Sequence, residues 1–208
     1  MPRLGQTNQL PDASTKVNFT LTPRDSNITH TLVFDNGIGF HEQLWSDVPY
    51  REAAPSWRRG NARLHVVGDP AANHSVVWWE GTKRDGTTWT TAYASMDGKG
   101  VKEGCDRDKK GLLHIEATDT TTNVTMTVAD GLNLKLDITK FQPFTYRRGG
   151  LDQISYGRWT GMVDAALGNA TKLTGVAWIE EGDFFGQPWM RGGDGEVLSE
   201  GVVVEEGY

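Results

Sequence analysis

Residues 123–139 alternate between apolar and polar side chains with the period of a β-strand. Asp130-Gly131 interrupts the alternation once and divides the segment into two runs. The apolar positions are Val124, Met126, Val128, Leu132, Leu134, Leu136 and Ile138. Alternate side chains of a strand share one face, and Asp-Gly favours a tight hairpin turn. The segment is therefore predicted to form a hairpin with one buried and one solvent-facing side.

Similar patterns recur along the whole chain. Further strands are predicted at 16–22, 29–34, 62–67, 74–80, 88–95, 111–118, 153–162, 172–180 and 201–206. Turn dipeptides stand at Asn36-Gly37, Asp85-Gly86, Asp97-Gly98 and Asp194-Gly195. About ten antiparallel strands with short turns must close or protect their edges. The predicted fold class is therefore all-β, as an antiparallel barrel or a two-sheet sandwich.

Length and composition predict one folded domain. The chain has 208 residues, 37% of them hydrophobic, and no Pro- or Ser-rich linker divides it. We expect a flexible N-terminal segment over 1–15 and a single all-β domain over 16–208. No apolar run reaches the ~18–20 residues of a membrane helix. A net charge of −6 disfavours nucleic acid as a partner; the oligomeric state is left open.

The pattern Val-x-Trp-x-Glu-x5-Gly-x2-Trp occurs twice in the chain. The copies are Val76, Trp78, Glu80, Gly86, Trp89 and Val176, Trp178, Glu180, Gly186, Trp189. In a strand, each copy aligns a valine, a tryptophan and a carboxylate on one face. A carboxylate on an inward aromatic face is costly unless it binds a ligand or transfers protons.

Glu80 and Glu180 are accordingly the predicted catalytic residues, and we expect the two carboxylates to share one cavity and divide acid and base roles. The predicted substrate-binding tryptophans are Trp78, Trp89, Trp178 and Trp189, whose faces suit flat or cyclic ligands. The alternative is that both glutamates reach solvent and most tryptophans only pack in the core.

An aromatic residue followed by two arginines and a glycine also occurs twice. The segments are Trp57-Arg58-Arg59-Gly60 and Tyr146-Arg147-Arg148-Gly149. Arg58 and Arg147 are predicted to hold a carboxylate or phosphate of the substrate. The alternative is that these arginines are surface charges of an acidic protein.

The segment 97–111 is rich in glycine and carboxylates, and a calcium site is predicted there with Asp97, Asp106 and Asp108 as ligands. Lys110 breaks the EF-hand spacing, so a solvated loop is the alternative. The histidines lack the spacing of a zinc site. Without a phosphate loop or dinucleotide fingerprint, no cofactor is expected to be required.

Five of the nine asparagines lie in Asn-x-Ser/Thr sequons: Asn18, Asn27, Asn73, Asn123 and Asn169. Sequons act as glycosylation sites only in the secretory pathway, which favours a secreted glycoprotein. The single cysteine, Cys105, excludes an intramolecular disulfide, and the N-terminus shows no signal peptide. Secretory or extracellular localisation is therefore predicted, with the cytoplasm as the alternative.

The C-terminal stretch Gly175-Val-Ala-Trp178-Ile-Glu180, with Asp194-Gly195 and the closing strand Gly201–Tyr208, resembles the last strands of lipocalin-like barrels. Such barrels occur in cyclases, hydratases and pericyclases of natural-product pathways. The resemblance covers about a fifth of the chain. It implies a barrel with an internal apolar cavity and redox-free chemistry on a terpenoid or polyketide.

These observations favour a cofactor-independent cyclase or isomerase, in which carboxylates transfer protons to a hydrophobic small molecule in an aromatic-lined cavity. The first alternative is a secreted carbohydrate-binding or carbohydrate-active β-sandwich, such as a glycosidase or lyase. The second is a non-catalytic lipocalin-like carrier.

Overall fold

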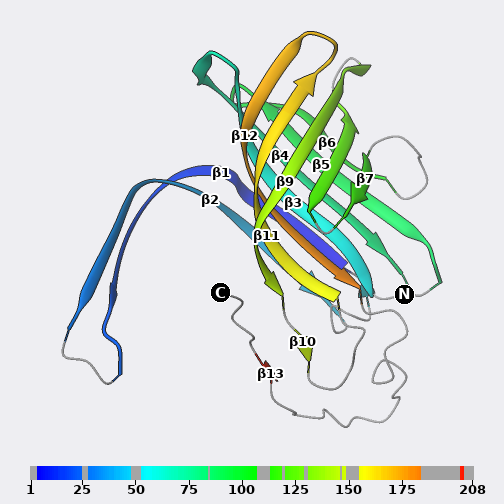
Figure 1. Ribbon diagram of the computed structural model, residues 1–208. Helices are drawn as coiled ribbons and strands as arrows, with labels where there is room; N and C mark the ends of the chain where they lie inside the picture. The colour runs from blue at the N-terminus through cyan, green and yellow to red at the C-terminus, as the bar shows by residue number, and fades with distance from the viewer. Residues whose placement is uncertain are drawn as a thin grey trace. The chain divides into compact units, whose positions relative to one another are not determined.

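The computed structural model describes residues 4–24, 28–47, 53–83, 85–106, 113–118, 120–128, 131–145, 147–148, 155–183 and 202–203. Thirteen strands lie in these ranges (Figure 1). They are β1 (Leu4–Leu21), β2 (His30–Ser46), β3 (Ser56–Val66), β4 (Asp69–Thr82), β5 (Thr88–Met96), β6 (Lys99–Asp106), β7 (Leu113–Ala117), β8 (Thr121–Thr127), β9 (Asn133–Thr145), β10 (Arg147–Arg148), β11 (Ser155–Leu167), β12 (Thr171–Asp183) and β13 (Val202–Val203). Within the same ranges, no helix has the length and apolar character needed to cross a membrane.

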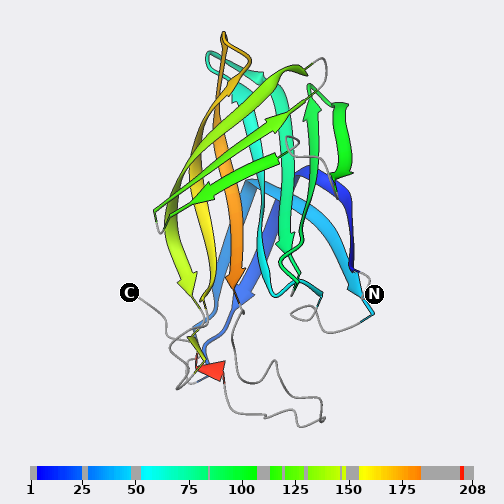
Figure 2. The ribbon, with the colours of Figure 1, turned by 90° about the vertical axis from the view of Figure 1, so that its right-hand side faces the viewer.

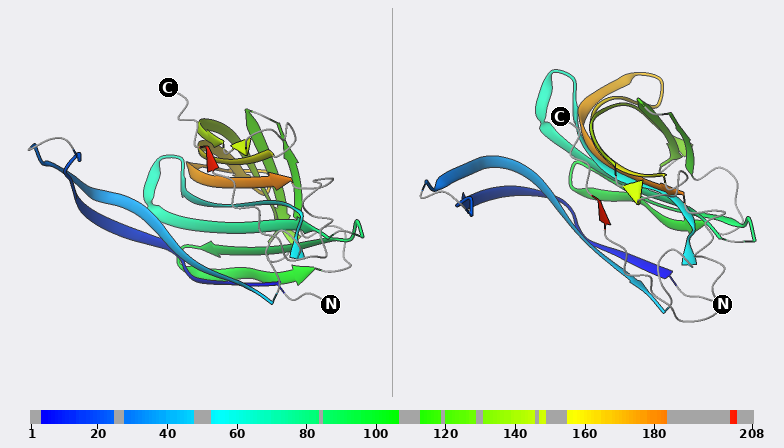
Figure 3. Two further views of the ribbon diagram at one scale, coloured as in Figure 1. Left: turned by 90° about the horizontal axis from the view of Figure 1, so that it is seen from below. Right: turned by 60° about the horizontal axis from the view of Figure 1, so that its bottom comes forward.

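Nine of these strands form one antiparallel sheet in the order β6-β5-β4-β3-β12-β11-β9-β8-β7. The sheet curls strongly along this order, as Figures 2 and 3 show. The curl brings the edge strand β7 close to β4 and β5. The nine-stranded sheet is thus a curled half-barrel, which confirms the all-β prediction and decides for the barrel over the sandwich.

The concave inner face of this sheet carries the main hydrophobic core. Its fully buried members come from strands throughout the sheet, including Leu64 of β3, Val76 of β4, Leu136 and Ile138 of β9, and Ile179 of β12. Burying each such side chain stabilises the fold by about 1.5–3 kcal/mol. The core positions of β8 and β9 are those that the alternation predicted, and Gly131 has the positive φ of a turn between them. For Leu132 the prediction is wrong, because this residue precedes β9 and is 47% exposed.

The strand and turn predictions hold in most places. Turns with positive φ occur at Gly86 and at Asp97-Gly98. At Asn36-Gly37 the turn prediction is wrong, because β2 continues through both residues. Asp194-Gly195 lies outside the described residues.

The described chain also contains two small sheets, β1-β2 and β10-β13. The chain divides into two compact units. One unit is Gln6–Leu44, and the other combines Met1–Gly5 with Trp45–Tyr208. The N-terminal segment expected over 1–15 lies largely in β1, because pairing with β2 satisfies the backbone of a sequence that lacks strand-like alternation. The single-domain boundary at residue 16 stays a prediction.

Candidate functional site

The strand register places the two Trp-Glu copies on opposite faces of the nine-stranded sheet. Glu80 of β4 pairs with Arg58 of β3, and Arg58 pairs on its other side with Glu181 of β12. Glu180 pairs instead with Arg59. Directly paired residues share a face, so Glu80 lies on the inner face with Trp78, and Glu180 on the outer face with Trp178. The two glutamates do not share one cavity, which corrects that expectation.

Glu80 and Arg58 form a loose pair on the inner face. Arg58 Nη1 lies 3.6 Å from Glu80 Oε1, and the two side chains are 43% and 22% exposed. Within the described part of the chain, neither side chain makes a hydrogen bond. Burial raises the pKa of the Glu80 carboxyl above its ordinary value, and the charges of Arg58 and His114 offset the rise only in part. Glu80 is therefore a carboxyl group suited to give and take a proton.

Trp78 precedes Glu80 on the same face and is 1% exposed. Gly60 of β3 lies opposite Trp78. A Cβ at Gly60 would overlap the Trp78 ring, so glycine there lets the indole lie across β3. The indole Nε1 is buried and has no hydrogen-bond partner among the described residues.

The inner face also holds a second polar cluster, centred on Lys140. Its ammonium lies 2.8 Å from Glu181 Oε1, donates to the Thr118 carbonyl at 2.7 Å, and sits 4.2 Å from the centre of the Trp159 ring. Thr122 Oγ1 also donates to Glu181 Oε1 at 3.2 Å. Each charge in this cluster therefore has close partners, as a buried ion pair requires.

Glu180 is 3% exposed and is held by three donors on the outer face. Its Oε1 accepts from Trp57 Nε1 at 3.2 Å and from Arg59 Nε at 3.0 Å, and its Oε2 accepts from Arg158 Nε at 2.8 Å. Burial by itself raises the pKa of Glu180, but the hydrogen bonds and charges of Arg59 and Arg158 outweigh it and hold the pKa below its ordinary value. Glu180 is thus a carboxylate at neutral pH, and it orients two guanidiniums.

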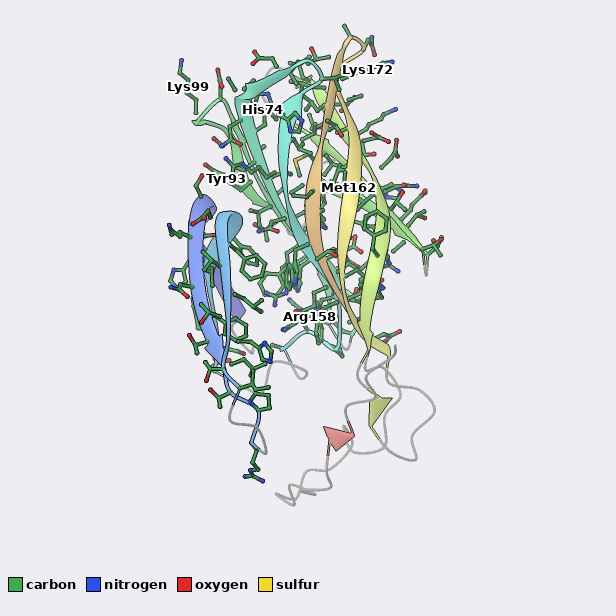
Figure 4. The ribbon with its side chains drawn as sticks, turned by 60° about the vertical axis from the view of Figure 1, so that its left-hand side comes forward. His74, Tyr93, Lys99, Arg158, Met162 and Lys172 are labelled. Carbon is green, nitrogen blue, oxygen red and sulfur yellow. The ribbon has the colours of Figure 1, made fainter. Side chains whose placement is uncertain are left out.

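The outer face is also rich in tryptophan. Arg59 and Arg158 lie 5.3 and 5.8 Å from the centre of the Trp178 ring, within cation–π range. Trp79 and Trp89 meet edge to face at 4.6 Å. In Figure 4, Arg158 lies near the lower end of β11 and Met162 farther along the same strand. Their even spacing places both on this outer face.

The remaining predicted residues are distributed as follows. Trp189, Asp108 and Asn27 lie outside the described residues, and for Arg147 and Asp106 only the backbone is described. Asp97, Asn18, Asn123 and Asn169 are exposed, whereas Asn73 accepts a hydrogen bond from Arg63 Nε at 3.0 Å. Among the described residues, no group of three or more His, Cys, Asp or Glu side chains is placed to hold a metal ion. The calcium site gains no support from them.

Sequence reasoning missed Arg59, Lys140 and Glu181. Glu181 lies in β12, and its side chain points inward to Lys140. Lys140 continues the alternation of Leu134, Leu136 and Ile138, which assigns it to the inner face, because the irregularity of β9 lies beyond it, opposite Arg158 and Thr160. A signal for Glu181 existed in the alternating apolar residues Leu173, Ala177 and Ile179, which assign the odd-numbered residues of β12 to the core.

No family model matches the sequence. Two curated proteins match part of it. Quinolone epoxide rearrangement protein asqO of Emericella nidulans is 29% identical over 108 residues. Quinolone epoxide rearrangement protein penF of Penicillium thymicola is 28% identical over 96 residues. The matched segments are 52% and 46% of this chain. They are only 26% and 23% of those two proteins, about a quarter of their length.

The fold is similar to that of CghA. The crystal structure of CghA with Sch210972 superposes with a TM-score of 0.61 and 13% identity, over 87% of this chain and 55% of CghA. A second CghA structure gives a TM-score of 0.59. The resemblance to lipocalin-like barrels, predicted from the C-terminal residues, is thereby confirmed at the level of the fold.

Proposed function

We propose that this chain is part of a non-redox enzyme that rearranges or cyclises an apolar small molecule on the inner face of the curled sheet, with Glu80 transferring the proton. The observation that carries the proposal is the state of Glu80. It is partly buried beside an indole, its pKa is raised, and it makes no hydrogen bond within the described residues. The Glu180 and Lys140 clusters, in contrast, are held by several donors.

The names of the two curated relatives suggest the reaction. An epoxide opens when an acid protonates its oxygen: the proton moves from Glu80 to that oxygen, and the electron pair of one C–O bond moves to the oxygen as the bond breaks. The positive charge left on carbon lies near aromatic faces, which stabilise it. The Glu80 carboxylate then takes a proton from a neighbouring carbon, and a C=C bond forms. Substrate and product are isomers, and no oxidant or reductant is consumed.

Matched variants of the full chain test this role. Quinolone epoxides are incubated with wild type, Glu80→Gln and Glu180→Gln, and products of unchanged mass are quantified by chromatography and mass spectrometry. Gln keeps the shape of Glu80 but cannot donate the proton, so we expect turnover to fall by about 10²–10⁴-fold. Folded Glu180→Gln should keep more activity than Glu80→Gln.

Full turnover by folded Glu80→Gln would rule out the assignment. Saturable binding of the epoxide by wild type without any conversion would favour a non-catalytic carrier instead.

A further inference from the structure

We infer that the indole N–H of Trp78 and the guanidinium of Arg58 together bind one oxygen atom of the substrate beside Glu80. The inference rests on the proposed function and narrows the substrate class to apolar ring compounds that carry a carbonyl or epoxide oxygen. Trp78 then acts as an oxygen-binding residue as well as an aromatic wall.

The first support is the buried donor itself. An indole N–H removed from water without an acceptor costs about 1–3 kcal/mol. Within the described residues, Trp78 Nε1 and Trp79 Nε1 are both such donors, and of the two only Trp78 lies on the inner face. The inner-face Lys140, in contrast, has every partner that its ammonium can use. A cost of this kind on the inner face, beside Glu80, calls for an explanation, and an acceptor supplied by a ligand provides one.

The second support is the direction of the ring. The Trp78 atoms nearest a Cβ built on Gly60 are Cζ2 and Cε2, and Cε2 is the carbon bonded to Nε1. The N–H edge of the indole therefore lies over β3, the strand that also carries Arg58. Arg58 and Gly60 alternate on β3 as Glu80 and Trp78 do on β4, so the four positions form one block on the inner face. Since Gly60 has no side chain, Trp78, Arg58 and Glu80 are the only side chains of that block.

The third support is the unused capacity of Arg58. Its guanidinium has five N–H donors, and its closest charged partner among the described residues is Glu80, at 3.6 Å. This loose contact leaves the long side chain able to turn toward a substrate oxygen. Two donors on that oxygen would stabilise the charge it gains as its C–O bond breaks. Each such donor typically contributes about 10²–10³-fold in rate.

Nitrogen-15 NMR of the indole N–H groups tests the inference directly. The chain has eight tryptophans, and Trp78→Phe identifies the resonance of Trp78 by its loss. The protein is titrated with 4-phenyl-2-quinolinone, which has a ring carbonyl, and with 1-phenylnaphthalene, which has the same shape and no acceptor. We expect the Trp78 N–H resonance to move downfield with the quinolinone, more than the other indoles do, and not with the hydrocarbon.

A near-isosteric substitution tests how much the Trp78 N–H contributes to the binding free energy. Benzothienylalanine at position 78 replaces the N–H by sulfur and keeps the bicyclic ring. We expect quinolinone affinity to fall about 2- to 10-fold, the value of one hydrogen bond, and hydrocarbon affinity to stay unchanged. The same substitution at Trp79, a buried indole on the outer face, is the control and should leave both affinities unchanged.

An unmoved Trp78 resonance, or unchanged quinolinone affinity in the benzothienyl variant, would overturn the inference. If Glu80→Gln still abolishes turnover in that case, the proposed function stands without the oxygen site. If Glu80→Gln keeps full turnover, the proposed function itself fails.

Discussion

Glu80 and Glu180 occupy matching positions in two copies of one motif, but their surroundings shift their pKa values in opposite directions. Glu80 is desolvated and has one loose cationic neighbour, whereas Glu180 is desolvated and bound closely by Arg59 and Arg158. Two guanidiniums at hydrogen-bonding distance overcome the cost of burial, and one at 3.6 Å does not.

Glu180→Gln is expected to destabilise the fold. The substitution leaves the buried Arg59 without its carboxylate, which costs about 3–5 kcal/mol when a buried pair is broken. Because the folded pKa of Glu180 is lowered, its contribution is fully present above pH 4.5 and is lost as the pH falls through the folded pKa. Urea unfolding of wild type and variant from pH 7 downward measures this difference. A cost that persists unchanged at the lowest pH would contradict the ion-pair explanation.

Glu80→Gln is expected to have the opposite effect on stability. Since the folded pKa of Glu80 is raised, the wild type loses stability as the pH rises from 4.5 through that pKa. Gln has no charge to desolvate, so the variant should have the higher free energy of unfolding at pH 7 and should lose this advantage below pH 4.5. The same urea experiments check it, and a variant less stable than wild type at pH 7 would show that the Glu80 carboxylate stabilises the fold.

At the scale of elements, the site depends on register. Pairing fixes which residues share a face, and a slip by one residue would exchange Glu180 and Glu181 between the two faces of β12. Alternation predicted most strands and the core positions of β8 and β9. It did not predict that one copy of the motif faces inward and the other outward, since both copies have the same internal spacing and only pairing with β3 distinguishes them.

The dependence on pairing between distant strands also explains two other differences between the sequence prediction and the structure. The N-terminal half of β3, Trp57-Arg58-Arg59-Gly60, has no apolar alternation because its outer side chains are also buried; the strand was predicted to begin at residue 62 but begins at Ser56. Lys140, the partner of Glu181, lies 41 residues away from it in the chain. Arg158, a partner of Glu180, lies 22 residues away. Local sequence patterns carry no information on such contacts, so the strands were predictable and the polar clusters were not.

Gly175→Ala should weaken the central pairing of β12 with β3. A Cβ at 175 would overlap the backbone carbonyl of Arg63, which a side-chain rotation cannot relieve. We expect a loss of about 1–3 kcal/mol, as for other overpacked sites, measured by urea unfolding. Gly100→Ala is the control, because a Cβ there meets only the Tyr93 hydroxyl at 3.9 Å. Equal stability of the two variants would contradict the close approach of β12 to β3.

At the scale of the whole molecule, the curled sheet provides an apolar concave face on which few polar groups are left with unused hydrogen-bonding capacity. Those identified on it are Trp78, Arg58 and Glu80, which adjoin one another. The fold matches that of CghA over 87% of this chain, while the chain matches about a quarter of the two rearrangement proteins. Fold alone does not determine the reaction, so the proposed chemistry depends on this block of residues.

The dependence of kcat/KM on pH tests the role of Glu80 most directly. If Glu80 donates the proton, wild-type kcat/KM should fall tenfold per pH unit above a single pKa that lies higher than 4.5. Glu80→Gln should show a low rate without this alkaline limb, and folded Glu180→Gln should retain the limb. An alkaline limb of unchanged pKa in Glu80→Gln would show that another group supplies the proton and would contradict the account.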